Sequence, residues 1–330
     1  MNLALPAPVA RWLHDGRLYA VLAAAGFSMK AVFVKLAYAA GPVDALTLLA
    51  MRMGCALPLF LWLILRTGGL AANRLSPADI GRVWMLGCVG YYLSSLFDFY
   101  GLTYISAGLE RMILYLYPTL VLLLQAWLMR QRPSRHVWVA MTICYGGLAV
   151  AFAHDLHQSG QGADVAKGAA WVFASAVTYA LYYHGTGSVV GRIGSTRLAG
   201  LAGSASSILV LAHFALLGQP ATVLALPAAV WGNALLMAVF STVLPVWWLS
   251  LAIQRLGAGQ AAAIGTMGPV LTVFAAWLLL GESLSLLQMA GLALVMYGIT
   301  RLKPQQARQK PGAPQTAPVA QAERAGRAGH

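Results

Sequence analysis

The sequence predicts an all-α membrane protein of ten transmembrane helices, arranged as two inverted five-helix repeats. Three observations support this fold class: the scarcity of charge, ten apolar runs of membrane-spanning length, and a match between the two halves of the chain. Only 9% of the 330 residues are charged and 59% are hydrophobic, whereas a soluble domain carries about 25% charged residues. So little charge cannot cover a surface in water, but it suits a surface in contact with lipid.

Ten apolar runs follow one another along the chain. Each is close to the ~20 residues that a helix needs to cross about 30 Å of hydrocarbon. They cover residues 18–39, 44–65, 83–105, 107–129, 136–153, 168–187, 195–217, 228–251, 257–280 and 284–302. Residues 1–17 are expected to form a cytoplasmic N-terminal segment. Residues 303–330 are rich in Pro, Gln, Ala and Arg without periodicity, which is typical of a disordered tail, here expected in the cytoplasm.

The positions of Lys and Arg predict the orientation in the membrane. With the N-terminus in the cytoplasm, Lys167 is the only one of the 22 Lys and Arg residues in an external segment, and four lie within spans. Because cations are retained on the cytoplasmic side, we expect a multi-pass protein of the inner (plasma) membrane with both termini in the cytoplasm. The net charge of +13 then reports topology, and no nucleic-acid partner is expected.

The two halves match when the chain is shifted by 151 residues. Residues 107–134 then fall on 258–285, with a shared Ala-Gly at the helix start and a shared proline further along, Pro118 and Pro269. An odd number of helices per repeat inverts the second repeat relative to the first, which is the architecture of alternating-access carriers. The predicted repeats cover 18–153 and 168–302. Duplication without transport is the alternative.

The small-residue helix start, the mid-span proline and the turn at Gly281-Glu282 resemble the EamA family of the drug/metabolite transporter superfamily. Arg52 in the second span is similar to an arginine that this family often has there. The resemblance implies a ten-helix fold, a cavity between the halves, and transport of a small metabolite, usually export. Because Arg130-Gln131 stands where the second half has Gly281-Glu282, Glu282 is interpreted either as a turn or capping residue or as a working group.

Six ionisable side chains lie inside spans of the first half: Lys30, Lys35, Arg52, Asp98, Glu110 and Arg111. A charge in hydrocarbon costs at least ~2.5–3.5 kcal/mol on insertion scales, so it needs a partner or a watery cavity. One interpretation is a cavity wall that binds a carboxylate or phosphate on the substrate, while Asp98 or Glu110 carries a coupled proton. The other is an ion-pair network that closes an outer gate, for example Asp98 with Arg52.

Depth divides these side chains into two groups. Lys30 and Arg52 lie too deep to reach water without a cavity, and with Asp98 they form the predicted substrate site. Polar stripes at helical spacing predict supporting residues, with packing as the alternative: Tyr91, Tyr115, Ser175 and Thr178.

The remaining charges lie nearer the membrane surface, where a role in closing an outer gate is favoured. Lys35, Glu110 and Arg111 are interpreted as gate or ion-pair residues, for example with Glu110 paired to Lys35. Pro118 and Pro269 each remove a backbone hydrogen bond within a span, and the resulting kinks are interpreted as hinges, with a mere bend as the alternative.

These features predict a secondary active transporter, an exporter of a small polar or anionic metabolite such as an amino acid, that uses alternating access with proton coupling or exchange. No phosphate-binding glycine loop, nucleophile elbow or metal-ligand motif is present in the sequence, so no cofactor, metal site or enzymatic activity is expected. A sensor or enzyme on the same fold and a passive channel are the alternatives. The expected partners are a small-molecule substrate and the lipid bilayer, with a homodimer as a further option.

Overall fold

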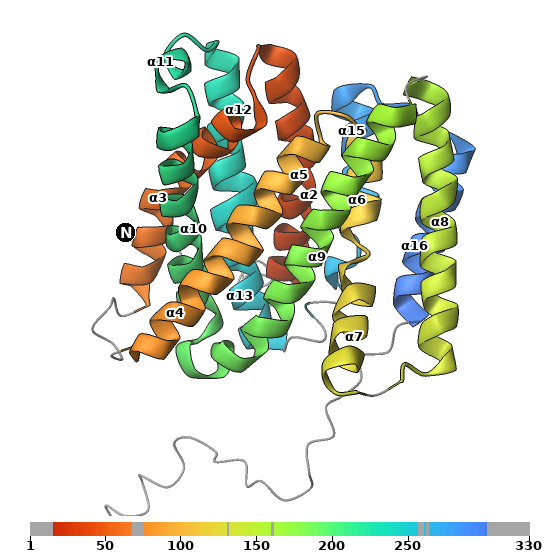
Figure 1. The fold of residues 1–330 in the computed structure, drawn as a ribbon, viewed down its shortest axis with the longest axis horizontal. Coiled ribbons are helices and arrows are strands. Elements are labelled where there is room, and N and C mark those ends of the chain that lie inside the picture. Colours follow the sequence, from red (N-terminus) through yellow and green to blue (C-terminus); the bar gives the residue numbers. More distant parts are fainter. Residues whose placement is uncertain are drawn as a thin grey trace, which may run out of the picture.

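A computed structural model describes residues 16–67, 75–130, 132–159, 162–256, 261 and 264–301. Within these ranges the chain is helical apart from short connections (Figure 1). Six helical stretches are long and apolar enough to cross a membrane, and two shorter apolar helices accompany them. The predicted all-α membrane fold is confirmed, while the count of ten spans stays a prediction. The predicted terminal segments lie outside the described residues, except that Gly16 and Arg17 already belong to the first helix.

The helices fall into two matching series. The first half contains α2 (Gly16–Ala40), α3 (Ala45–Arg66), α4 (Pro77–Leu86), η1 (Gly87–Leu93), α5 (Ser94–Gly101), α6 (Ala107–Leu114), α7 (Tyr117–Leu128) and α8 (Arg135–Ser159). The second half contains α9 (Gly162–Ile193), α10 (Ser195–Leu217), α11 (Pro220–Val223), α12 (Ala228–Ala238), η2 (Val239–Val243), α13 (Leu244–Leu256), α15 (Gly268–Leu280) and α16 (Leu286–Arg301). The elements η1 and η2 are π-helical.

Backbone irregularities recur at equivalent places in the two halves. The π-helical η1 lies between α4 and α5, and η2 lies at the equivalent point between α12 and α13. Turns at residues 115–116 and 266–267 precede α7 and α15. Pro118 and Pro269 stand in the first turn of these two helices, where a missing N–H leaves no helical hydrogen bond unmade. The prolines therefore begin new helices, and they do not bend continuous ones; their role as hinges stays a prediction.

Packing between the halves has the pattern of a two-fold related pair. Equivalent helices contact each other, α8 along α16 and α3 along α10 (Figure 1). The other contacts exchange equivalent partners: α2 packs on α12, α13 and α15, while α9 packs on η1, α5 and α7. Self-complementary contacts of this kind arise when two similar units are related by a two-fold axis. The predicted inverted-repeat architecture is therefore confirmed.

Small residues let α8 and α16 approach closely. A Cβ built on Gly147 would lie 2.6 Å from the carbonyl oxygen of Gly291, and one on Gly298 would lie 2.9 Å from that of Ala140. Ala140 and Gly147 precede Gly291 and Gly298 by 151 residues, so the same contact is made twice. Close backbone approach through small residues is how membrane helices associate without a hydrophobic driving force.

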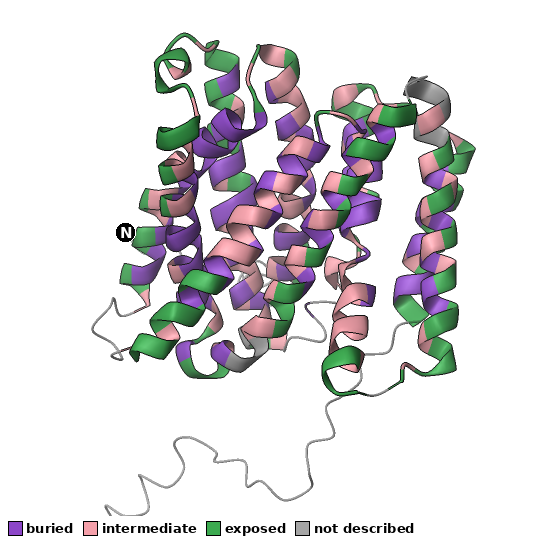
Figure 2. Cartoon of the chain, viewed as in Figure 1, coloured by how far each residue is buried: buried purple, intermediate pink, exposed green. Residues whose placement is uncertain are grey.

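The outer surface carries large apolar side chains, as a lipid-facing surface should. Figure 2 shows buried residues where helices face one another and exposed residues along the outer helices. On α15, for example, Val270, Phe274 and Trp277 are exposed, while Thr272 and Val273 face the interior as buried residues. The apolar exterior and polar contacts inside reverse the usual arrangement of a soluble domain.

A left-handed backbone residue ends the helix at equivalent points in the two halves. Gly281 has φ 67°, and Arg130, 151 residues earlier, has φ 51°. A side chain costs about 1 kcal/mol in this conformation relative to glycine. No atom would contact a Cβ at Gly281, so Gly281→Ala should lower the free energy of unfolding by about that amount. Thermal unfolding in detergent measures this, with Gly232→Ala as the control, since Gly232 is also open but has no positive φ. Equal unfolding temperatures for the two variants would contradict the expected backbone strain of an alanine at position 281.

Candidate functional site

Three buried charged side chains and the half-buried Lys30 form one cluster in the first half. Lys30 Nζ lies 2.7 Å from Asp98 Oδ2 and 3.5 Å from Glu110 Oε1. Arg111 Nε lies 3.7 Å from Glu110 Oε2. The two carboxyl groups also lie close enough to interact with each other. The side chains of Asp98 and Glu110 are 1% and 0% exposed, whereas that of Lys30 is 15% exposed. Of the four side chains, that of Lys30 is therefore the most exposed.

Three helices position this cluster. Lys30 comes from α2, Asp98 from α5, and Glu110 and Arg111 from α6. The short α6 is fixed at its start, where the Ser106 hydroxyl accepts a hydrogen bond from a backbone N–H of the first turn. Arg111 Nη2 donates to the carbonyl oxygen of Phe27, at 2.7 Å, and so ties α6 to α2. The cluster is consequently a junction between three separate spans of one repeat.

Arg52 lies apart from these ion pairs and links the two repeats. Its guanidinium is buried; Nε donates to Thr242 Oγ1 at 2.9 Å, and Nη1 lies 3.5 Å from Ser95 Oγ. The guanidinium carbon also lies 5.4 Å from the centre of the Phe99 ring. Thr242 stands in η2, and its hydroxyl donates to Met237 O at 2.8 Å. Arg52 is thus held by hydroxyl groups and a ring, which a carboxylate on a ligand can outcompete.

The structure joins residues that the sequence assigned to different roles. Both carboxylates reach Lys30, so the pairs differ from the suggested Asp98 with Arg52 and Glu110 with Lys35. Lys35 lies further along α2 and is half-buried. Two predicted substrate residues, Lys30 and Asp98, and two predicted gate residues, Glu110 and Arg111, therefore form a single cluster.

Several predicted supporting residues use their hydroxyl groups within the helix packing. Ser175 Oγ donates to Ser94 O at 2.8 Å, and the two serine hydroxyls lie 3.0 Å apart. Thr178 Oγ1 donates to Ser175 O at 2.8 Å. Tyr115 donates its phenol proton to Gly265 O at 2.9 Å, across the two halves. These contacts fit the packing alternative for Ser175 and Thr178 and give Tyr115 a place between the repeats.

Sequence reasoning missed a group of tyrosines near the predicted Tyr91. The Tyr91 and Tyr182 hydroxyls lie 3.4 Å apart, and their rings meet edge to face at 5.3 Å. Tyr117 stacks on Tyr183 at 4.9 Å and meets Tyr179 edge to face at 5.1 Å. The spacing of the three α9 tyrosines, i, i+3 and i+4, places them on one helix face, and this signal was available in the sequence.

The contact of α2 with α15 and the equivalent contact of α9 with α7 are built from different side chains. Ser28 Oγ donates to Gly268 O at 3.0 Å, and Thr272 Oγ1 donates to Ser28 O at 3.0 Å. The positions 151 residues from Ser28 and Gly268 are Tyr179 and Tyr117, whose rings are in contact. Small hydrogen-bonded residues therefore close α2 onto α15, while tyrosine rings fill the equivalent space between α7 and α9.

Glu282 caps a helix of the other repeat. Its Oε1 accepts a hydrogen bond from Ala107 N at 2.8 Å, and its Oε2 accepts one from Gly108 N at 3.3 Å. These are unsatisfied donors at the start of α6, where a negative charge is also favoured by the helix dipole. Of the two interpretations of Glu282, the structure shows the capping role.

Removal of this cap should destabilise the protein measurably. Glu282→Ala leaves two donors without their acceptor and should cost about 1 kcal/mol of unfolding free energy. Glu282→Gln keeps one acceptor and should lose less. Unfolding of both variants in detergent tests the order; an Ala variant as stable as the wild type would show that the cap does not stabilise the protein.

Comparison with known proteins identifies the family. The profile described as "EamA-like transporter family" matches residues 15–153 and 166–302, almost the entire helical part of the chain. The chain belongs to this family. The EamA-like chain is 30% identical to the Bacillus subtilis (strain 168) protein named "Uncharacterized transporter YcbK", over 87% of this chain and 92% of that protein. "Uncharacterized transporter YyaM" of the same organism is 24% identical over 83% and 90%.

A solved protein crystal structure supports the fold of this EamA-like chain. The two are 19% identical, with a TM-score of 0.59 over 90% of this chain and 99% of the other. Together with the family match and the apolar helices, these similarities make the protein a multi-pass membrane transporter of the drug/metabolite type.

Proposed function

We propose that this EamA-like protein is a secondary active transporter that exports a small polar or anionic metabolite, such as an amino acid. Transport uses alternating access, with proton coupling or exchange as the driving force. The observation that carries the proposal is Lys30, a partly accessible cation backed by the buried carboxyl groups of Asp98 and Glu110. It lies inside a pair of inverted repeats, the architecture in which carriers place their substrate sites.

An anionic group on the substrate fits two cations of this region, Lys30 and Arg52. Lys30 offers an ammonium group with 15% of its side chain exposed. Arg52 offers a planar guanidinium whose hydroxyl partners, Thr242 and Ser95, are neutral. A carboxylate forms stronger, charge-assisted bonds with such groups than hydroxyls do. Substrate binding then replaces the internal partners of the two cations.

The pair of carboxyl groups can carry the coupled proton. Asp98 and Glu110 adjoin each other and share Lys30 as a counter-ion. When the amino group of an amino-acid substrate binds one of these carboxylates, it competes with a proton for the same group, so proton uptake releases the substrate, as export against an inward proton gradient requires. The pair thereby connects occupancy of the site with protonation, which is the requirement for coupling to a proton gradient.

Alternating access requires the two contacts between the repeats to open in turn. In the described conformation, α2 is closed onto α15 by the hydrogen bonds of Ser28 and Thr272. The equivalent contact between α7 and α9 consists of tyrosine side chains. We propose that the α2–α15 side faces outward, because the Lys and Arg distribution places both termini in the cytoplasm of an inner-membrane protein. A small solute and the bilayer are the proposed partners.

Two measurements on purified protein test this function. A thermal-shift screen with amino acids and small carboxylates finds a ligand that stabilises the native state. The labelled ligand is then tested for counterflow in proteoliposomes. A carrier shows saturation and transient accumulation against the unlabelled pool, whereas a channel shows neither. The absence of any solute movement would support the sensor or enzyme alternative.

A further inference from the structure

An open groove of about 630 Å³ lies at the junction of α7 and α8, away from the Lys30 cluster. Arg130 and Arg132 line it together with Trp127 and Trp138. The two tryptophans are 76% and 53% exposed. The described lining contains no carboxylate. The groove therefore combines two cationic side chains with two large amphipathic rings at one end of the helical bundle.

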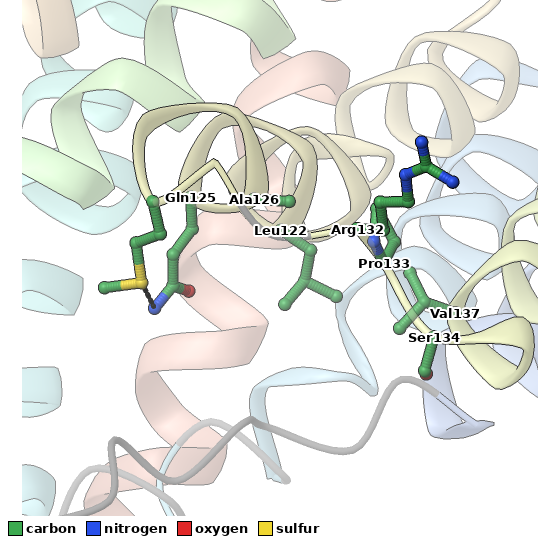
Figure 3. A pocket seen from close by; sticks show the side chains of 8 residues that line it. Leu122, Gln125, Ala126, Arg132, Pro133, Ser134 and Val137 are labelled. Carbon is green, nitrogen blue, oxygen red and sulfur yellow. Dashed lines mark hydrogen bonds between the residues drawn. The ribbon is translucent and has the colours of Figure 1, made fainter.

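A smaller pocket beside the groove shows how Arg132 is oriented. Figure 3 shows Gln125 on one side of this pocket, and its Nε2 donates to Met129 Sδ at 3.9 Å. The guanidinium of Arg132 points away from this pair. This pocket, of about 20 Å³, has room for no more than a water molecule. A larger ligand is therefore restricted to the open groove.

The backbone at Arg130 is a second, independent observation. Its φ of 51° is the only positive φ of a non-glycine residue among the described residues, at the position equivalent to Gly281. Glycine would adopt this conformation without strain. A side chain in this conformation is kept at a cost, and here it is a cation that lines the groove.

We propose that this groove binds the head group of an anionic phospholipid from the cytoplasmic leaflet. The lipid phosphate lies between Arg130 and Arg132, and the acyl chains follow Trp127 and Leu123 on the α7 surface. Basic pockets at helix ends bind such head groups, and Trp side chains favour the depth of the glycerol region. The C-terminal residues 302–330 are a poor occupant, because they hold five Lys or Arg residues and one Glu.

A matched pair of arginines supplies the control. Arg82 and Arg192 also lie outside the predicted spans, on the same expected side, and they pair with Asp79 at 3.3 and 2.7 Å. A hydrogen bond from Ser76, together with these arginines, holds the pKa of Asp79 below its usual value. The single carboxylate of Asp79 therefore offsets half of the charge of these two arginines, whereas the groove has no described carboxylate.

Native mass spectrometry of the detergent-solubilised full chain, with phosphatidylglycerol or phosphatidylcholine added, tests the proposal. The wild type should bind phosphatidylglycerol about tenfold more tightly or better, since each Arg near an anionic head group contributes about a threefold to fivefold preference. Arg130→Gln with Arg132→Gln should bring the two lipids to within about twofold of each other, and Arg82→Gln with Arg192→Gln should preserve the preference. Glutamine keeps a side chain at the strained position, so only charge is changed.

Three outcomes would overturn the lipid site. The wild type can bind the two lipids equally, both double variants can lose the preference equally, or inorganic phosphate at matched concentration can displace the bound lipid completely. The last result would indicate a site for a free anion. None of these results bears on the transported solute, so this inference stands or falls separately from the proposed function.

Discussion

Lys30→Met should abolish transport and lower the free energy of unfolding by about 3–5 kcal/mol, because it leaves the buried Asp98 and Glu110 carboxyl groups without their shared cation. The protein should still insert in the membrane, since α2 remains apolar. Transport is measured as counterflow in proteoliposomes, and stability as thermal unfolding in detergent. The size of both effects follows from the position of the ammonium group between two carboxyl groups.

A second variant separates the role in transport from the role in stability. Lys30→Met combined with Asp98→Asn removes both charges of the 2.7 Å pair, while Glu110 keeps Arg111 at 3.7 Å. This variant should recover most of the lost stability, because a charge pair removed together leaves no uncompensated charge. It should not recover transport. Wild-type counterflow in the double variant would show that the pair is structural only.

Gly147→Ala should destabilise the protein by about 1–3 kcal/mol through overpacking of the contact between α8 and α16. The added Cβ would meet two backbone atoms of α16, Gly291 O at 2.6 Å and Val295 N at 2.8 Å, and the side-chain Cβ of Leu294 at 2.7 Å. Backbone atoms of a packed helix cannot move aside singly, so the whole helix must shift. Thermal unfolding in detergent, supported by the yield of folded protein, measures the loss.

The neighbouring glycine is the control for this prediction. A Cβ on Gly146 would contact nothing within 4 Å, so Gly146→Ala should be neutral or stabilising, as alanine favours helix over glycine. Both variants replace glycine with alanine on the same helix. They differ only in the atoms that the added methyl group contacts. If both unfold at the same temperature, close packing at Gly147 is not a source of stability.

The fold was predictable because its main signals are local and repeated. Apolar runs of spanning length and the 151-residue match need no knowledge of tertiary contacts. The positions of Pro118 and Pro269 were recognised, and each stands in the first turn of a helix that follows a two-residue turn; their role as hinges stays a prediction. A proline pattern shows where a helical hydrogen bond is missing, and it does not show on which side the helix stops.

Which charged residues lie within the helical bundle was predictable, and how they pair was not; their assignment to a substrate site stays a prediction. Buried charges are rare enough in membrane spans to identify Lys30, Arg52 and Asp98 from composition alone. Their partners depend on the rotation of each helix about its axis, which a sequence without tertiary contacts does not specify. Thr242 was missed for this reason, because one hydroxyl in an apolar span has no pattern that marks it as the acceptor for Arg52.

The alternate opening of the two repeats is the central claim, and the accessibility of residue 28 tests it most directly. Ser28 is 1% exposed between α2 and α15. With Cys55, Cys88 and Cys144 replaced by alanine, Ser28→Cys is treated with a membrane-impermeant thiol reagent from one side of the membrane at a time. During transport we expect the cysteine at position 28 to be labelled from both sides of the membrane. Addition of substrate should raise the labelling rate from one side and lower it from the other. Labelling from one side only, or from neither, would contradict alternating access.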